Sequence, residues 1–283
     1  MQDSTSCILI ENKKLVHIKH KSIKNMTESE FGAYLAGLWE ADGHFSKQQQ
    51  IVFAFHKLDL ELSNRLCTFF GHGHVSRIKG KEAYKWVISN IEGIIKFLNL
   101  IDGHLRLPEK LLQIQTNVQV DKILKLTNFS QKEPKEDISS LTSSYWLAGF
   151  TDGDGSFYIQ MSQRDKSGRT EIRLHYKVAV KYPDLLNQLS RAFGSSVHKR
   201  SHVNKEGQEI YTYYWSSTSF ENAYKVHKYF HRYHLQSSKY LNFYKWRKAL
   251  RLIYEQKHTT SAGIAEIRRL KDSMNSKLIL KKC

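Results

Sequence analysis

One twelve-residue segment occurs twice in this chain, and this repeat limits the possible folds more than any other feature. Residues 34–45 read YLAGLWEADGHF and residues 146–157 read WLAGFTDGDGSF, so the copies are 146 − 34 = 112 residues apart. Each copy has small residues, then an acidic cluster, then a glycine and an aromatic residue. We therefore expect two halves with the same local structure around the acids Asp42 and Asp154.

Three further pairs of segments extend the repeat. TFFG, ending at Gly71, matches RAFG, ending at Gly194; YKWVIS around Trp86 matches YYWSST around Trp215; and PEKLL matches SSKYL. The offset grows from 112 to 194 − 71 = 123 and then to 215 − 86 = 129 residues. Each increase falls on a polar, glycine-containing stretch of the second copy, where a longer hairpin is tolerated. The ordered matches indicate an internal duplication.

The hydrophobic pattern predicts the order α-β-β-α-β-β-α in each copy. In the first copy we expect a helix over 28–41 with Thr27 as N-cap, strands within 43–57, a helix over 58–70, a hairpin over 74–90 and helices over 91–125. In the second copy the corresponding elements are a helix over 142–153 with Thr142 as N-cap, strands within 155–181, and then a helix over 183–193, a hairpin over 197–218 and helices over 219–256. The predicted fold class is α+β, with two pseudo-symmetric repeats and a four-stranded antiparallel sheet in each.

The domain boundaries follow from the repeat and from the segment between its copies. Residues 1–126 are expected to form the N-terminal repeat and residues 143–258 the C-terminal repeat. The intervening residues 127–142 are polar and charged with one proline, which is typical of a linker. Residues 259–283 are expected to form a helical tail.

Composition restricts the partners that such a chain can bind. Lysine and arginine exceed aspartate and glutamate by 44 − 27 = 17, and they are spread along the whole chain, which favours a broad surface for a polyanion such as DNA or RNA. With 40% hydrophobic residues the chain can bury a core, which disfavours global disorder. Three widely spaced cysteines argue against a disulfide framework, and no apolar run reaches the ~18 residues of a membrane span. The start shows neither a signal peptide nor a transit pattern.

Apolar and basic side chains alternate in the segment EIRLHYKVAVK, residues 171–181. This period of two predicts a strand with its apolar set beneath the helices and the other set in solvent. The outward set would contain the cationic or imidazole side chains Arg173, His175, Lys177 and Lys181. An ordinary solvated face would carry mixed charges, so this basic row favours contacts with phosphates and bases.

Small residues precede the acids of both motifs at a spacing of four. The pairs are Gly32/Ala36, Ala33/Gly37, Ser144/Ala148 and Tyr145/Gly149. Small residues at this spacing let two helices approach closely, which would bring the helix ends, and with them Asp42 and Asp154, together. Two carboxylates there repel each other and the negative helix ends, and a divalent cation such as Mg²⁺ would relieve the repulsion. Beside a basic sheet, this arrangement favours phosphodiester hydrolysis. The alternative is that the acids are ordinary solvent-facing residues at the helix ends, without a catalytic role.

The segments LAGLWEADG (35–43) and LAGFTDGDG (147–155) resemble the two signature motifs of the LAGLIDADG homing endonucleases, in particular the branch with both motifs in one chain. The resemblance covers about residues 28–256. It implies a monomer whose two saddle-shaped sheets straddle the major groove of double-stranded DNA and which cuts both strands of a long asymmetric target. The implied cofactor is Mg²⁺, with Mn²⁺ or Ca²⁺ as substitutes for binding.

The resemblance also implies roles for individual residues. The metal ligands would be the final acid of each motif and the carbonyl before it: Asp42, Ala41, Asp154 and Gly153. A basic residue near each site would be Lys110 or Lys239, and a polar residue at the end of a second strand would be His56 or Lys57 in one copy and Lys181 in the other. The earlier acids Glu40 and Asp152 would serve helix packing or polar contacts. The implied DNA contacts are Ser46, Gln48, Gln50, Arg77, Lys79, Lys85, Tyr158, Gln160, Ser162, Arg173, His175, Lys177, Lys199 and Arg200.

Two alternatives remain open at this stage. Some proteins of this family act as RNA maturases for their host intron, with intron RNA as the partner, and a DNA-binding regulator could use the same fold. A membrane partner is not expected. The implied location is an organelle, the mitochondrion first, where the protein would be both encoded and made. A zinc site at Cys67, His72 and His74 is disfavoured because three donors lack a fourth.

Overall fold

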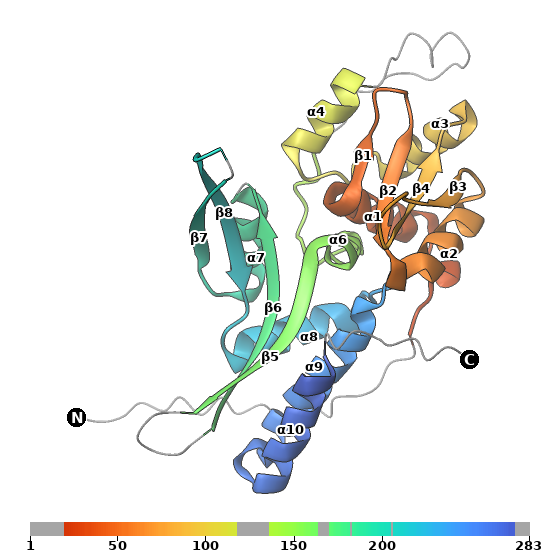
Figure 1. The fold of residues 1–283 in the computed structure, drawn as a ribbon. Coiled ribbons are helices and arrows are strands. Elements are labelled where there is room, and N and C mark those ends of the chain that lie inside the picture. Colours follow the sequence, from red (N-terminus) through yellow and green to blue (C-terminus); the bar gives the residue numbers. More distant parts are fainter. Residues whose placement is uncertain (1–19, 118–135, 164–169, 182, 205, 275–283) are drawn as a thin grey trace.

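The computed structural model describes residues 20–117, 136–163, 170–181, 183–204 and 206–274, and two four-stranded antiparallel sheets lie among them (Figure 1). The first sheet has the strand order β1-β2-β4-β3 and contains β1 (Gly43–Phe45), β2 (Ile51–His56), β3 (His74–Arg77) and β4 (Ala83–Ile88). The second has the order β5-β6-β8-β7 and contains β5 (Gly155–Gln163), β6 (Thr170–Val180), β7 (Val197–Val203) and β8 (Glu209–Ser216). The predicted α+β fold with two equivalent halves is confirmed.

Helices flank both sheets in the same order in each half. The first half contains α1 (Glu28–Asp42), α2 (Leu60–Phe70), α3 (Ile91–Ile101) and α4 (Pro108–Asn117), with short 3₁₀ turns η1 (Ile23–Asn25) and η2 (Lys57–Asp59). The second contains α6 (Trp146–Asp154), α7 (Asp184–Phe193), α8 (Phe220–Arg232) and α9 (Lys239–Tyr254), followed by η3 (Lys257–Thr259) and α10 (Ser261–Ser273). The predicted structure of 118–126, most of the linker, and the predicted tail beyond 274 lie outside the described residues. No helix in the described part of the chain is long and apolar enough to cross a membrane.

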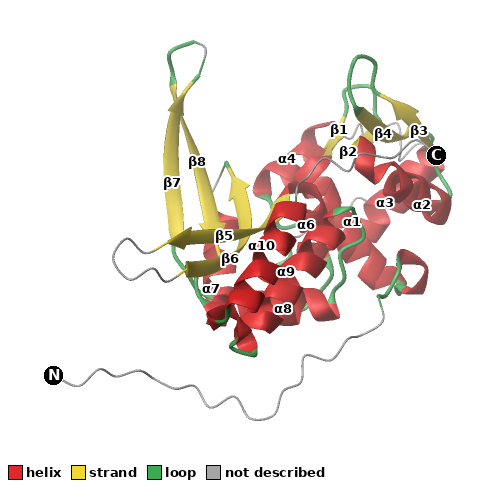
Figure 2. Cartoon of the chain, turned by 60° about the horizontal axis from the view of Figure 1, so that its bottom comes forward, coloured by secondary structure: helices red, strands yellow, loops and turns green. Residues whose placement is uncertain are grey.

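Helices α1 and α6 pack against each other at the centre, between the two sheets (Figure 2). The closest approach is at Gly37 and Gly149, one from each motif. A Cβ on Gly37 would overlap the Trp146 carbonyl, and a Cβ on Gly149 would overlap the Tyr34 carbonyl. Backbone-to-backbone contact of this kind requires glycine at both positions.

Two residues of the predicted small-residue stripe, Gly32 and Ser144, do not lie between α1 and α6. Gly32 packs against the carbonyl of Leu100 in α3 and not against α6. Gly32 precedes Gly37 by five residues, which turns it about 140° around a helix of 3.6 residues per turn. Ser144, also assigned to the stripe, lies before the start of α6.

The two motif helices begin differently. The predicted N-cap Thr27 is confirmed, because its side chain accepts a hydrogen bond from the Glu30 amide while the Glu30 carboxylate accepts one from the Thr27 amide. The predicted N-cap Thr142 is wrong, because α6 begins only at Trp146. The Tyr229 hydroxyl takes over this role: it accepts from the Ala148 amide at 3.0 Å and donates to the Ser144 carbonyl at 2.7 Å.

Candidate active site and nucleic-acid interface

The two motif aspartates end α1 and α6 and lie on the same side of the helix pair. Gly43 and Gly155 follow them in extended conformation and start the first strand of each sheet. A Cβ placed on Gly153 would lie 3.1 Å from Oδ2 of Asp42, so the Asp42 carboxylate lies directly against the residue that precedes Asp154. Both aspartates keep part of their surface open to solvent, while protein covers the rest of each carboxyl. The packed helices therefore bring one carboxylate from each repeat to one open position.

The electrostatic environment of this pair resists ionisation. Burial of the carboxyl by surrounding protein, followed by the nearby charge of Asp42, raises the pKa of Asp154 to about 6, against the opposing effect of two lysines. Burial also raises the pKa of Asp42, although Lys239 and Lys110 lower it. Ionising both carboxyls at once is therefore unfavourable, and a bound cation would remove this repulsion.

One lysine from each repeat lies beside the aspartates. Lys110 in α4 donates a hydrogen bond to the Gly43 carbonyl, and its ammonium is 5.1 Å from the centre of the Trp39 ring. Lys239, the first residue of α9, donates to the Thr151 carbonyl at 3.2 Å and also to the Gly153 carbonyl. Burial lowers the pKa of both lysines, while the neighbouring acids raise it. Two lysines 129 residues apart therefore lie beside the aspartates, although Lys110 contacts the residue after Asp42 and Lys239 the residue before Asp154.

The donor set around Asp42 and Asp154 fits a hard divalent cation. Within the described ranges, no group of three or more His, Cys, Asp or Glu side chains is arranged to hold a metal. A cation at the aspartate pair would therefore take two carboxylates and complete its shell with carbonyl, phosphate or water oxygens, which are the ligands that Mg²⁺ prefers. The Gly153 carbonyl, expected as a ligand, already accepts from Lys239 and would have to share or release that ammonium.

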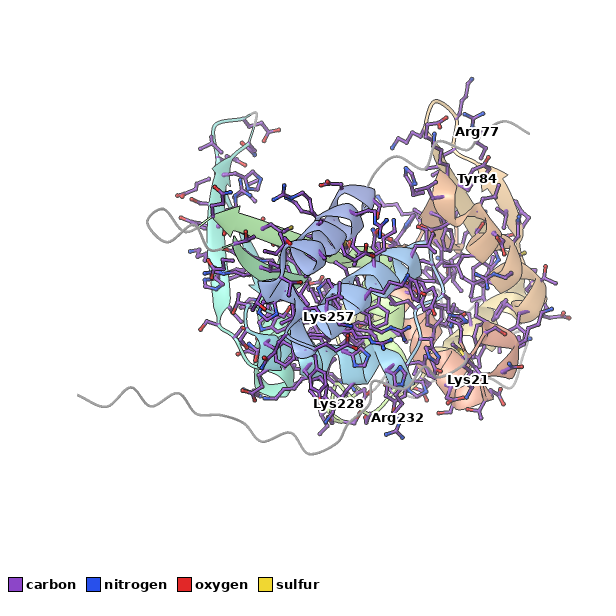
Figure 3. The ribbon with its side chains drawn as sticks, turned by 90° about the horizontal axis from the view of Figure 1, so that it is seen from below. Lys21, Arg77, Tyr84, Lys228, Arg232 and Lys257 are labelled. Carbon is purple, nitrogen blue, oxygen red and sulfur yellow. The ribbon has the colours of Figure 1, made fainter. Side chains whose placement is uncertain are left out.

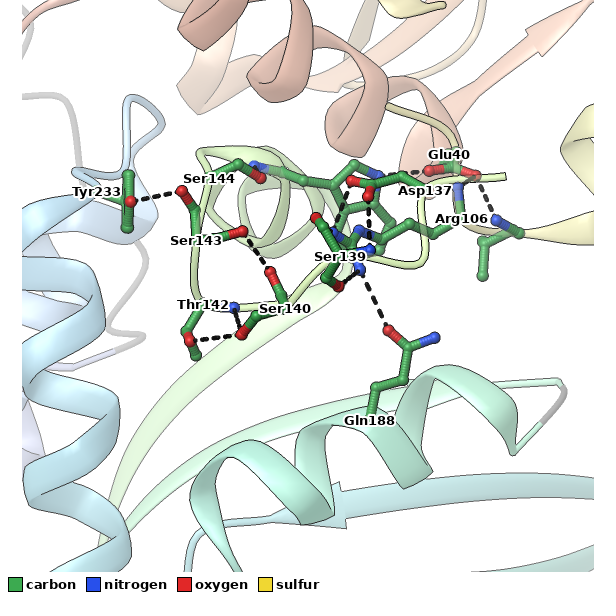
Figure 4. A network of polar contacts seen from close by, with 12 residues as sticks. Glu40, Arg106, Asp137, Ser139, Ser140, Thr142, Ser143, Ser144, Gln188 and Tyr233 are labelled. Carbon is green, nitrogen blue, oxygen red and sulfur yellow. Dashed lines mark hydrogen bonds and ion pairs between the residues drawn. The ribbon is translucent and has the colours of Figure 1, made fainter. Parts of the chain in front are cut away.

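The earlier acid of the first motif, Glu40, is buried and holds three donors (Figure 4). Its Oε1 accepts from the amides of Arg106 and Leu107 at 2.9 and 2.6 Å, and its Oε2 accepts from the Trp146 indole at 2.5 Å. The two amides belong to the turn that leads into α4, and Trp146 belongs to α6. Glu40 therefore ties the lysine-bearing helix of its own repeat to the motif helix of the other repeat.

The earlier acid of the second motif, Asp152, makes the equivalent connection: it ties the turn before α9 to helix α1 of the first repeat. It accepts from the Gln236 amide at 2.7 Å, from the Ser237 amide and hydroxyl at 3.2 and 2.5 Å, and from the Tyr34 hydroxyl at 2.8 Å. Ser237 corresponds to Pro108, since 237 − 129 = 108. Proline has no N–H, so in the first repeat the longer glutamate reaches back one residue further.

We expect Glu40→Gln to remove part of the pH dependence of folding. Burial raises the pKa of Glu40 from 4.5 to about 7, although the hydrogen bonds from Leu107, Arg106 and Trp146 lower it. Because the folded pKa exceeds the unfolded one, stability falls as pH rises from about 4.5 to about 7. The full effect is about 3 kcal/mol, at about 1.4 kcal/mol per pKa unit. Urea unfolding of parent and variant with a chelator should give a stability difference that changes across this window; a pH-independent difference would refute the assignment.

Arg106 anchors the segment that enters the second repeat (Figure 4). Its fully buried guanidinium pairs with Asp137 at 2.6 Å, donates to the carbonyl and hydroxyl of Ser139 at 2.9 Å, and donates to Gln188 of α7 at 3.3 Å. The guanidinium also lies 5.5 Å from the Trp146 ring centre. No sequence pattern indicated this residue, because its partners come from three separate segments.

The two strand-end candidates occupy different surroundings. Lys181 lines the same cleft as Asp154 and Lys110. In the first half, Lys57 pairs with Glu82 and lines a different cleft, together with Ser237 and Leu241. His56 caps η2 through a hydrogen bond from the Leu58 amide to its Nδ1 at 3.3 Å. Of these strand-end candidates, Lys181 is the one that lines a cleft together with a motif aspartate.

The outward face of the second sheet holds half of the predicted DNA contacts. The register pairs Tyr158 with His175 and Gln160 with Arg173, on the face opposite the buried Phe157. This face carries the predicted residues Tyr158, Gln160, Ser162, Arg173, His175, Lys177 and Arg200. In the first sheet Lys85, opposite Ala54, also faces outward. A basic, aromatic surface therefore lies beside the aspartate pair.

Several predicted contacts lie elsewhere. Lys199 and Arg77 share their faces with the core residues Trp215 and Trp86, because neighbouring strand residues point to opposite sides. Lys79 lies in the turn between β3 and β4. His175 faces outward but is buried, stacked on Tyr158 with ring centres 4.5 Å apart and hydrogen-bonded to Gln160 and Ser216.

The three contacts predicted on the first strand lie in a turn. β1 ends at Phe45, and residues 46–50 fold back so that the Ser46 amide donates to the Gln50 carbonyl at 2.8 Å. Gln49 adopts a left-handed conformation with φ of 62°. Ser46, Gln48 and Gln50 are therefore grouped at a hairpin tip and do not alternate along a strand. Outward residues that the sequence reasoning missed include His44, His74, His198, Thr212 and Tyr214.

Comparison with known proteins agrees with this architecture. The family model described as LAGLIDADG endonuclease matches residues 35–120 and 147–250, one stretch for each repeat. The chain belongs to the LAGLIDADG endonuclease family. An uncharacterized cox1 intron-2 37.2 kDa protein of Schizosaccharomyces pombe is 38% identical over 270 residues, which covers 92% of this chain and 77% of the relative.

Other LAGLIDADG relatives carry two kinds of names. The intron-encoded DNA endonuclease aI3 of Saccharomyces cerevisiae is 28% identical, and the alignment covers 86% of this chain and 68% of that protein. The intron-encoded RNA maturase bI4 of the same yeast is 28% identical, with 80% and 36% covered. Among solved structures, the meganuclease I-CpaMI bound to uncleaved DNA has a TM-score of 0.65 at 18% identity, covering 86% of this chain and 99% of that one. I-SmaMI bound to uncleaved DNA with calcium ions has a TM-score of 0.60 at 24% identity, covering 86% and 98%.

Proposed function

We propose that this protein is a site-specific homing endonuclease that makes a metal-dependent double-strand break in a long, asymmetric DNA target. The observation that carries the proposal is the convergence of Asp42 and Asp154, each beside a half-buried lysine, at the junction of two sheets. A structural pair of helix-end acids would not need a lysine from each repeat. DNA has two strands to cut, and the duplicated chain offers one set of groups to each.

The residues divide the work of hydrolysis. Asp42 and Asp154 hold the metal, for which Mg²⁺ is proposed. A divalent cation bound there supplies Lewis acidity toward the phosphate. Lys110 and Lys239 bring an ammonium to each side of the aspartate pair, where it neutralises charge that develops on the phosphoryl group and the leaving oxygen. Lys181 adds a further cation from the wall of the cleft.

The sheets supply binding and base recognition. The exposed cations and amides on their outward faces, among them Lys85, Gln160 and Arg173, contact phosphates and base edges. One chain carries both aspartates, so it acts as a monomer. The cox1 intron in the name of the Schizosaccharomyces relative supports a protein made in the mitochondrion.

The decisive experiment is cleavage of a plasmid that carries the intronless junction of the host gene. We expect linear product with Mg²⁺, and none with a chelator or with a plasmid interrupted at that junction. Protein that binds the junction tightly but never cuts it in Mg²⁺ or Mn²⁺ would refute the nuclease assignment.

A second candidate function is assistance to intron splicing, and one surface favours it. Beyond Lys239 at the aspartate pair, helix α9 carries the cations Lys245, Arg247, Lys248 and Arg251 and no acid. Lys228 and Arg232 of α8 lie with Lys21 along an edge of the molecule far from Arg77 of the first sheet (Figure 3). A basic surface away from the outward sheet faces suits an RNA backbone. Filter binding of host intron RNA should weaken with Lys228→Glu and Arg232→Glu, whereas junction DNA binding should not.

A further inference from the structure

Tyr34 and Trp146 occupy the same position of the two repeats, since 146 − 34 = 112, and each contacts the opposite half. Both side chains are fully buried. The Tyr34 hydroxyl donates to Asp152 at 2.8 Å, and the Trp146 indole donates to Glu40 at 2.5 Å. Two different aromatic residues thus make one equivalent contact across the helix pair.

Each acceptor also fixes the start of a lysine-bearing helix. Asp152 binds the amides of Gln236 and Ser237, and Lys239 follows two residues later. Glu40 binds the amides of Arg106 and Leu107, three residues before Lys110. A carboxylate that loses one buried donor must reorganise around the remaining donors. These remaining donors include the amides just before α9 or α4, so the start of that helix would shift with the carboxylate.

We propose that Tyr34 and Trp146 are positioning residues that act crosswise: Tyr34 sets Lys239 of the second repeat, and Trp146 sets Lys110 of the first. This inference rests on the proposed function for its cleavage readout. Its distinctive consequence is that one buried contact controls one DNA strand, because each lysine serves one scissile phosphate. A purely structural role at the shared helix interface would affect both strands alike.

The test is strand-resolved cleavage of a junction duplex labelled at one 5′ end and then the other. Lys239→Ala and Lys110→Ala first identify which strand depends on which lysine. Tyr34→Phe removes only a hydroxyl, and we expect it to slow the Lys239 strand about tenfold and the Lys110 strand less than about twofold, since loss of a supporting contact costs about 10–100-fold at such sites. Trp146→Phe should show the reverse preference.

Tyr233→Phe is the matched control. Its hydroxyl donates to the Ser143 carbonyl at 2.7 Å, so the variant also loses a buried tyrosine hydrogen bond but touches neither acid. Its strand ratio should equal that of the parent. Equal slowing of both strands by Tyr34→Phe, or slowing of the Lys110 strand, would overturn the crosswise assignment.

Amide hydrogen exchange decides the inference without cleavage. Tyr34→Phe should accelerate exchange of the Gln236 and Ser237 amides by about tenfold and leave the Arg106 and Leu107 amides within about twofold, because only the first pair shares its acceptor with Tyr34. A parent that cuts neither strand would refute the proposed function, and this exchange pattern would still support the coupling. Unchanged exchange at Gln236 and Ser237 would overturn the coupling even in an active nuclease.

Discussion

Asp42→Asn and Asp154→Asn will each abolish formation of linear product from a target plasmid, with a loss of more than about a hundredfold in rate. An amide keeps the shape of the side chain but loses the charge that a divalent cation requires, and the remaining carboxylate is a poor site alone. Binding of the intact target in chelator should stay within about threefold of the parent, because the sheets make the DNA contacts. Quantified agarose gels and a metal-free gel-shift assay measure the two effects.

Glu92→Gln is the control for these variants. Glu92 is an exposed acid in the first turn of α3, and its replacement removes one negative charge without touching the aspartate pair. It should cut at the parent rate. Parent-like linearisation by either aspartate variant would show that its carboxylate does not hold the metal.

The sequence predicts the fold well because the duplication presents the pattern of each helix and strand twice, so that each copy supports the assignment of the other. A capping box at Thr27 and matched glycines at 37 and 149 are local signals, and local signals set where α1 starts and where the helices touch. The errors occur where tertiary contacts decide. Thr142 satisfies the pattern of an N-cap, yet at the start of α6 the Ala148 amide donates to the Tyr229 hydroxyl of α8 and the Trp146 amide to the Ser144 hydroxyl.

The candidate site divides in the same way. The meeting of Asp42 and Asp154 follows from small-residue spacing and from the resemblance, and no tertiary information is needed to propose it. The pairing of Tyr34 with Asp152 joins residues 118 apart in sequence, and no periodicity within one segment encodes such a contact. Strand alternation places His175 on the outward face correctly, but it does not predict that stacking on Tyr158 buries the side chain there.

The second large effect is expected from Gly149→Ala. A methyl group there would overlap the Tyr34 carbonyl and lie 2.9 Å from the Leu38 amide nitrogen, and neither backbone atom can move alone. The helices must separate, at a cost of about 1–3 kcal/mol for overpacking a tight contact. Separation also parts the aspartates, so cleavage should fall further than folding does. Urea unfolding and plasmid linearisation measure the two losses.

Gly103→Ala is the control that separates loss of the α1–α6 backbone contact from the general effect of replacing a glycine by alanine. Gly103 has φ of 71° and nothing lies within 4 Å of an added Cβ, so this variant has only the strain of a left-handed alanine, about 1 kcal/mol. It should keep full cleavage at temperatures where it is folded. Gly37→Ala, the equivalent change in α1, should match Gly149→Ala because it meets the Trp146 carbonyl in the same way. A Gly149→Ala protein as stable and active as the parent would mean that the helices tolerate a wider spacing, and that close backbone contact is not what joins the two aspartates.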